Sequence, residues 1–169
     1  MSQKFERQAM QDPLSGLLNR RGMQDKLQNE FERNQRYKNN LTVMMCDIDN
    51  FKTINDRYGH DKGDEIIKSL VTIFNTGLRK QDSLARWGGE EYLFLLPETN
   101  TDQGMQLAEI LRNRIEKQQY THNKEKFSIT ISIGVHQIAG TDTINQAITK
   151  ADTNLYKAKE QGRNRCIIS

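Results

Sequence analysis

The alternation of apolar and polar residues divides the chain into helices and strands. Apolar residues at helical spacing, such as Met23, Leu27 and Phe31, predict a helix over Arg20 to Tyr37. The same spacing predicts four more helices. The first runs from Asn50 to Tyr58, and the second begins in the segment 59–64 and has an apolar face from Ile66 to Leu78. The third begins at Thr101, and the fourth begins near Thr143 and ends at Gly162. The patterns typical of strands occupy 41–49, 84–87, 92–96, 127–135 and a short edge segment at 166–168.

Helices and strands therefore interleave along the chain, and one pair of strands forms a hairpin. The stretch SLARWGGEEYLFLL places Gly88 to Glu91 between two runs that favour strands, which is a hairpin signal. A hairpin requires antiparallel pairing, so we expect an α+β or α/β fold with a mixed sheet covered by helices. Residues 1–11 are predicted to be the end of a linker helix, and residues 12–169 one domain.

Composition narrows the class of protein. The chain has 169 residues, 28% of them charged, and a net charge of +3 that is too small and dispersed to indicate binding to nucleic acid or membrane. No apolar run approaches the length of about 18 residues that a membrane span needs, and the first residues are not a signal peptide. Cys46 and Cys166 lie far apart without the spacing of metal ligands, so we interpret them as reduced thiols in a cytoplasmic protein.

Acidic residues stand at two predicted strand ends. Alternation places Asp47 on one face of its strand with Val43 and Met45, and a carboxylate at the end of a buried strand is costly unless it is paired or binds a metal. Glu90 and Glu91 repel each other unless a cation lies between them. The acids thus indicate a metal or a cationic partner, the alternative for the turn being ordinary solvated carboxylates. Asp49 is interpreted as the cap of the helix that follows it.

Five blocks of residues along the chain form a recognisable set. They are Asp47-Ile-Asp-Asn-Phe-Lys52; Asn55-Asp56 with Tyr58-Gly59-His60 and Gly63-Asp64; Arg86-Trp-Gly-Gly-Glu-Glu-Tyr92; Ser132-Ile-Gly134; and Ala151-Asp152 with Leu155-Tyr156, Ala158-Lys159 and Gly162-Arg163-Asn164. In this order the blocks resemble the GGDEF family, the diguanylate cyclases of bacterial signalling. The resemblance runs from Asp12 to the C-terminus. It implies a palm-like domain with a largely antiparallel sheet of about five strands. The implied reaction joins two GTP molecules into cyclic di-GMP in a transient homodimer, with one GTP per subunit and release of pyrophosphate.

The residue types at these positions suit phosphoryl transfer. Asp47, Glu90 and Glu91 supply carboxylates for Mg²⁺, with Mn²⁺ as the alternative ion, and the resemblance adds the carbonyl of Ile48 as a ligand. Glu90 or Glu91 is also placed to accept the proton of the attacking 3′-hydroxyl, and both assignments stay open. Lys52 is expected to neutralise charge on the transferring phosphoryl group.

Other residues are expected to bind the nucleotide. A carboxylate can accept both the N1–H and the exocyclic amine of guanine, so Asp64 with Asn55 is predicted to select GTP, as the matching family positions do. His60 lies between them and either contacts the nucleotide or is structural. Lys159 and Arg163 are expected to hold the outer phosphates, the alternative being basic residues that complement a helix dipole.

Arg79 and Asp82 form an Arg-x-x-Asp motif that many family members use as an inhibitory site for the product. A guanidinium can pair with the guanine edge or the phosphates of cyclic di-GMP, and the alternative is an exposed ion pair. Two departures from the family pattern are Tyr92 in place of Phe, whose hydroxyl needs a partner or water, and Asn50 in place of His.

The leading hypothesis is an active diguanylate cyclase with an upstream sensor domain. The alternatives are a catalytically silent relative that binds GTP or cyclic di-GMP, and a metal-dependent phosphohydrolase, which the absence of His and Asp clusters in the sequence makes a weak candidate.

Overall fold

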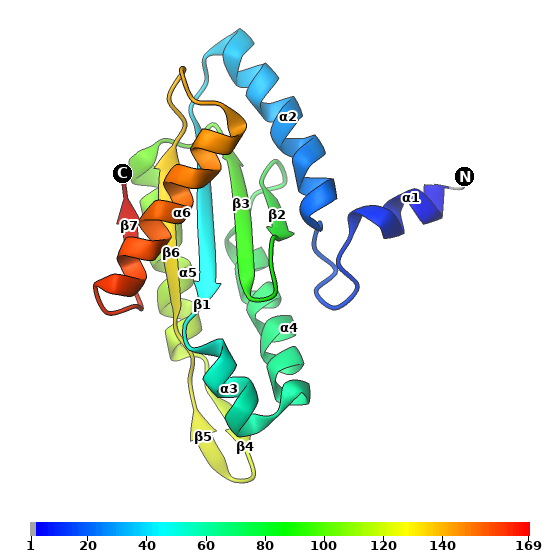
Figure 1. Cartoon of the computed structure of the whole chain (residues 1–169), viewed down its shortest axis with the longest axis vertical. Helices are drawn as coiled ribbons and strands as arrows, with labels where there is room; N and C mark the ends of the chain where they lie inside the picture. The colour runs from blue at the N-terminus through cyan, green and yellow to red at the C-terminus, as the bar shows by residue number, and fades with distance from the viewer. Residues whose placement is uncertain (1–2) are drawn as a thin grey trace.

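A central five-stranded sheet organises the computed structural model, which describes residues 3–169 (Figure 1). Its strand order is β2-β3-β1-β6-β7. The strands span Ser83–Arg86 (β2), Glu91–Pro97 (β3), Leu41–Ile48 (β1), Ile131–Gln137 (β6) and Cys166–Ile168 (β7). All neighbouring strands pair antiparallel except β6 and β7, which are parallel. The predicted mixed, largely antiparallel sheet of about five strands is confirmed, as are the hairpin and the short edge strand.

Helices cover both faces of the sheet. Helices α4 (His60–Gly77) and α5 (Thr101–Lys117) pack on one face, and α2 (Arg20–Tyr37) and α6 (Ile144–Glu160) pack on the other (Figure 1). Alternate residues of β1 enter the two cores: Met44, Cys46 and Ile48 face α4 and α5, whereas Val43 and Met45 face α2 and α6. The sheet is therefore buried on both sides, and β1 is buried along its whole length.

Capping side chains fix the starts of three helices. Asn19 Oδ1 accepts a hydrogen bond from the backbone of Gly22 at 2.9 Å at the start of α2. Asn100 with Gln103 at α5, and Thr143 with Gln146 at α6, form reciprocal capping boxes. These caps explain why the predicted helix starts at Arg20, Thr101 and near Thr143 agree with the structure. Helix α6 ends at Glu160, and Gly162 follows it with a positive φ of 119°.

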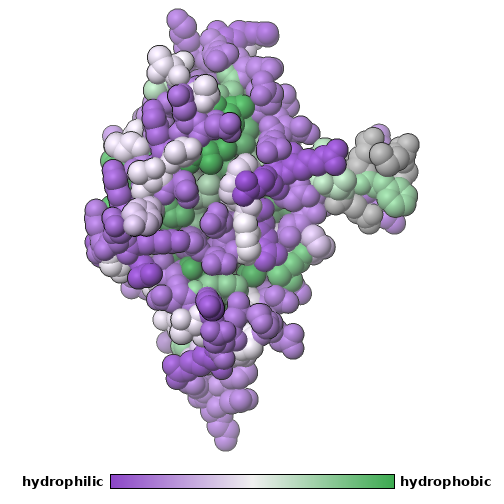
Figure 2. All heavy atoms as spheres, in the orientation of Figure 1, coloured by the Kyte–Doolittle hydropathy of each residue, from purple (hydrophilic) through white to green (hydrophobic). Residues whose placement is uncertain are grey.

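Two short helices complete the α-structure. Helix α1 (Gln3–Met10) occupies the predicted linker segment, of which residues 1 and 2 lie outside the described part of the chain. Helix α3 (Phe51–Tyr58) joins β1 to α4 through Gly59, whose φ is 90°. Within residues 3–169, no helix has both the length and the apolar character needed to cross a membrane. Most of the face shown in Figure 2 is hydrophilic, and hydrophobic side chains appear on it only in small areas.

The strand predicted over 127–135 is correct only from Ile131, because Phe127 belongs to a separate strand and residues 128–130 belong to none. β4 (Tyr120–His122) and β5 (Glu125–Phe127) make a hairpin that projects beyond the main sheet, and β6 begins only at Ile131 (Figure 1). The hairpin turns at Asn123 and Lys124, which both have positive φ. The apolar alternation continues across the break because Ile129, between the strands, is also buried in the core.

Candidate active site

Acidic residues from two neighbouring strands meet at one end of the sheet. In the antiparallel pairing of β1 and β3, Asp47 lies directly opposite Glu91. The backbone N–H of Ile48 donates a hydrogen bond to the carbonyl oxygen of Glu90 at 3.3 Å, which brings the second acid to the same place. The predicted convergence of Asp47, Ile48, Glu90 and Glu91 at the end of β1 follows from this register.

The carboxylate of Asp47 is buried and only partly satisfied. Its Oδ2 accepts a hydrogen bond from the ammonium of Lys159, whereas its Oδ1 has no hydrogen-bond partner within the described residues. The pKa of Asp47 is raised to about 6, chiefly by burial; Lys159 opposes this rise, and the charges of Glu90 and Glu91 contribute to it. An unpaired buried carboxylate oxygen beside two more acids is a place that fits a cation.

The turn that carries the two glutamates is held by backbone hydrogen bonds and one arginine. The N–H groups of Trp87 and Gly88 donate to the carbonyl oxygen of Glu91 at 2.8 and 3.2 Å. Arg86 donates through Nε and Nη2 to the carbonyl oxygen of Gly89 at 2.9 and 2.8 Å, and its Nη1 forms an ion pair with Asp12 at 3.2 Å. Sequence reasoning missed this role of Arg86, because its partner Asp12 is 74 residues away.

A cavity of about 530 Å³ opens beside this turn. Its walls include Lys52 and Asn55 from α3, His60 and Asp64 from α4, and Glu90 from the turn. The structure thus brings together five of the predicted site residues from three parts of the chain. Phe51, Asp56, Ile67, Arg86 and Gly89 complete the lining, and sequence reasoning assigned none of these five to the site.

The remaining predicted phosphate ligands lie at the end of α6. Lys159 reaches Asp47, as described above. Arg163 is exposed in a turn in which Gly162, Arg163 and Asn164 all have positive φ. A backbone that non-glycine residues rarely adopt has to be held by its surroundings.

Asp49 holds this turn, so its predicted role as a helix cap is wrong. Asn50, not Asp49, is the N-cap of α3, and it makes no capping hydrogen bond through its side chain. The carboxylate of Asp49 is buried and accepts hydrogen bonds from Thr130 Oγ1 and Ser132 Oγ, both at 2.7 Å, and from the backbone N–H of Asn164 at 3.0 Å. Asp49 therefore joins β6 to the turn that presents Arg163.

Arg79 and Asp82 lie apart from this site, where the chain enters β2 from α4. The guanidinium of Arg79 forms an ion pair with Asp82 at 2.9 Å and donates to Pro97 O at 2.6 Å and to Thr99 Oγ1 at 2.8 Å. Both residues line a second cavity of about 640 Å³, together with Lys26, Asn75 and other residues. Arg79 is therefore held in a fixed orientation at a polar cavity.

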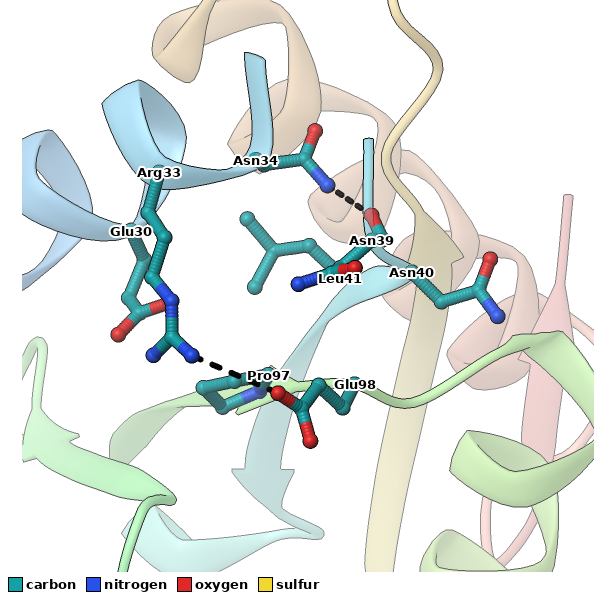
Figure 3. Close-up of a pocket in the computed structure, with 8 residues that line it drawn as sticks. All are labelled: Glu30, Arg33, Asn34, Asn39, Asn40, Leu41, Pro97 and Glu98. Atoms are coloured by element: carbon teal, nitrogen blue, oxygen red, sulfur yellow. Dashed lines mark hydrogen bonds and ion pairs between the residues drawn. The ribbon is translucent and has the colours of Figure 1, made fainter. Parts of the chain in front are cut away.

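A third pocket is too small for a ligand. It lies between the end of α2 and the start of β1, where Arg33 pairs with Glu98 at 3.5 Å and Asn34 donates to the carbonyl oxygen of Asn39 (Figure 3). Its volume of about 10 Å³ suits one water molecule at most. The candidate site is the 530 Å³ cavity that Glu90 lines, next to the strand end that carries Asp47.

Comparisons with known proteins agree with this geometry. The family model described as "Diguanylate cyclase, GGDEF domain" matches residues 9–165. Diguanylate cyclase DgcP of Pseudomonas aeruginosa is 39% identical over 161 residues, which cover 95% of this chain and 24% of DgcP. The chain spans less than half the length of the first curated relatives that it matches.

Two solved structures resemble the whole fold. The active GGEEF domain of a diguanylate cyclase from Vibrio cholerae is 37% identical, with a TM-score of 0.84 over 90% of this chain and 97% of that one. The GGDEF domain of DgcB from Caulobacter crescentus, in complex with c-di-GMP, is 26% identical, with a TM-score of 0.92 over 95% of this chain and 93% of that one.

Proposed function

The chain belongs to the diguanylate cyclase GGDEF domain family, and on this premise we propose that it condenses two GTP molecules into cyclic di-GMP with release of two pyrophosphates. The observation that carries the proposal is the convergence of Asp47, Glu90 and Glu91 beside the cavity that Lys52, Asn55 and Asp64 line. Nucleotidyl transfer requires carboxylates that bind a metal, a basic side chain that contacts phosphate, and polar groups that recognise a nucleobase.

We propose Mg²⁺ as the metal, with Mn²⁺ as the alternative. Within residues 3–169, no three His, Cys, Asp or Glu side chains are gathered closely enough to hold a metal by themselves. Mg²⁺ nevertheless fits, because it needs only one or two protein carboxylates and takes its other ligands from phosphates and water. Asp47, whose Oδ1 lacks a partner within residues 3–169, would supply one carboxylate, Glu90 or Glu91 the second, and the Ile48 carbonyl a further oxygen. The ion would supply positive charge to the triphosphate oxygens.

The nucleotide is proposed to lie with its base in the 530 Å³ cavity. Asp64 accepts the N1–H and the exocyclic amine of guanine, and Asn55 completes the recognition, with His60 beside them. Lys52 is placed to neutralise charge at the transferring phosphoryl group. Lys159 and Arg163, at the end of α6, are proposed to hold the outer phosphates.

Bond formation requires two chains. The 3′-oxygen of one GTP attacks the α-phosphorus of the GTP on a facing chain, the bond from that phosphorus to pyrophosphate breaks, and the reciprocal attack closes the ring. Glu90 or Glu91 accepts the proton of the attacking hydroxyl. We therefore propose a homodimer with one GTP per subunit. We also propose an upstream sensor domain and a cytoplasmic location, where GTP is available.

The test is incubation of the protein with GTP and Mg²⁺ at high concentration, with chromatographic detection of cyclic di-GMP and a parallel reaction with ATP. Formation of product from GTP but not from ATP supports both the proposed reaction and the selection of guanine. If the chain fused to a dimerising coiled coil also gives no product, the proposal is overturned in favour of a silent receptor. Glu91→Gln should abolish turnover without unfolding, and wild-type rates in that variant would refute the metal assignment.

Inhibition by product is proposed at Arg79 and Asp82. Its support is the guanidinium of Arg79 at the 640 Å³ cavity: Nε and Nη2 hold it on Asp82, Pro97 and Thr99, and Nη1, which makes no hydrogen bond within residues 3–169, can donate to a phosphate or a guanine edge. Initial rates should fall as cyclic di-GMP is added to the wild type, whereas Arg79→Ala should show little inhibition at the same concentrations. Exposed Arg114→Ala is the matched control. Equal inhibition of the Arg79 variant and the control would place the effect elsewhere.

A further inference from the structure

Gly63 lies directly behind the side chain of Asn55 in the wall of the candidate site. It is buried in the first turns of α4, and its backbone has no positive φ that would require glycine. A Cβ atom built on Gly63 would lie 2.0 Å from Asn55 Oδ1 and 3.1 Å from Asn55 Cγ. The next contact, Phe51 Cζ at 3.3 Å, is one that a small ring shift would relieve. The bare face of Gly63 is therefore the surface on which the Asn55 carboxamide rests.

The helices that carry these residues have little freedom to separate. The backbone of Gly59 donates to Asn55 O at 2.8 Å, and that of Gly63 donates to Gly59 O at 3.1 Å, so the α3–α4 junction is continuously hydrogen-bonded. From outside, the ring of Tyr58 stacks on Phe127 of the β4–β5 hairpin at 4.0 Å, and Lys62 Nζ donates to Thr121 O at 2.9 Å. A side chain at position 63 would consequently displace the Asn55 carboxamide rather than the helix.

We infer that Gly63 is a positioning residue for base recognition: its missing side chain is what allows Asn55 to lie in the cavity wall beside Asp64. The inference rests on the proposed function, in which Asn55 and Asp64 recognise guanine. In a helix glycine is less stable than alanine, so at this position the sequence gives up helix stability for the placement of Asn55. A purely structural role predicts the opposite result for an alanine substitution, namely equal binding and higher stability.

The experiment measures equilibrium binding of GDP and ADP, which lack the γ-phosphate, cannot release pyrophosphate and so report recognition without turnover. The wild type should bind GDP more tightly than ADP. Gly63→Ala should weaken GDP binding roughly tenfold or more, because a displaced amide leaves polar groups unpaired, and Asn55→Ala should weaken it to a similar extent. Its ADP binding should stay unchanged, and its urea midpoint should not fall.

A double variant separates positioning from other effects. In Asn55→Ala the obstruction is gone, so adding Gly63→Ala should cause no further loss of GDP affinity. Gly140→Ala is the control, since a Cβ atom there meets nothing within 4 Å. Wild-type GDP affinity in Gly63→Ala, an additive loss in the double variant, or unfolding of Gly63→Ala would each overturn the inference. Failure of the wild type to distinguish GDP from ADP would instead overturn the proposed guanine pocket, whatever the variants do.

Discussion

The hydroxyl of Tyr92 is a buried polar group without a partner, and its removal should stabilise the protein. Tyr92 lies in β3 and is 0% exposed, with its ring edge-on to Phe74 at 5.4 Å. Its Oη has no hydrogen-bond partner within residues 3–169, and burial raises its pKa. The apolar ring of Tyr92 therefore packs favourably in the core between the sheet and α4, whereas its buried hydroxyl oxygen is destabilising there.

The expected magnitude follows from the cost of an unpaired buried hydroxyl, which is about 1–3 kcal/mol. Tyr92→Phe removes that cost and leaves a gap of one oxygen atom, so we expect a net gain of about 1 kcal/mol in the free energy of unfolding. For a chain of this size, that gain corresponds to about 2–4 °C in Tm. Activity should not change, because Tyr92 does not line the site.

Tyr120→Phe is the matched control with the opposite sign. The hydroxyl of Tyr120 is hydrogen-bonded to Ser69 Oγ at 2.9 Å, so the same substitution there should cost about 0.5–1.5 kcal/mol. Urea denaturation of the wild type and both variants, followed by circular dichroism, measures the difference. If Tyr92→Phe destabilises the protein as much as Tyr120→Phe does, the Tyr92 hydroxyl has a partner, such as a buried water, and the reasoning is refuted.

Two further predictions concern the buried carboxylates of Asp49 and Asp142. Asp49→Ala should lower the free energy of unfolding by about 3 kcal/mol, because Ser132 and Asn164 lose their acceptor. It should also raise KM for GTP, because the turn that carries Arg163 loosens. A urea midpoint within about 0.5 M of the wild type would contradict the expected loss of stability. Burial of Asp142 opposes its ionisation, but hydrogen bonds from Lys150 and His136 prevail and lower its pKa to about 2 from 3.8. The ionised carboxylate therefore stabilises the protein above about pH 4, and this stability, about 1–2 kcal/mol after allowance for solvent screening, should be lost as the pH falls towards 2. Asp142→Asn should show a smaller loss between pH 5 and 3, and an identical loss would disprove the assignment.

Periodicity predicted most of the fold because it records which face of each element is buried. The helix over Arg20 to Tyr37 was clear because its apolar positions face one core, and the strand from Leu41 was clear as an apolar run because it is buried on both faces. The β4–β5 hairpin was missed because Phe127 and Ile129 show the same alternation as β6, although β6 begins only at Ile131. An apolar pattern reports burial, and it does not show where pairing breaks.

The candidate site was predictable as residue types but not as contacts. Asp47 stood out because a buried acid at a strand end is costly, and Glu90 and Glu91 stood out because adjacent acids repel each other. The pairing of β1 with β3 then placed Asp47 opposite Glu91. Asp49 looked like a helix cap because its partners Thr130, Ser132 and Asn164 are 81 to 115 residues away. Local sequence favours local hydrogen bonds, so a long-range role of this kind becomes visible only in three dimensions.

The register of β1 on β3 makes the acids dependent on residues that never touch a ligand. Asp47 faces Glu91 only because the pairs from Leu41 with Pro97 to Cys46 with Tyr92 hold the strands in step, and the acids themselves repel each other. A slip of one residue would turn every side chain of one strand to the opposite face. A core substitution that shifts this register can therefore abolish the proposed activity while the helices and the sheet persist. An inactive variant with a native-like spectrum would need its strand alignment examined before its active site.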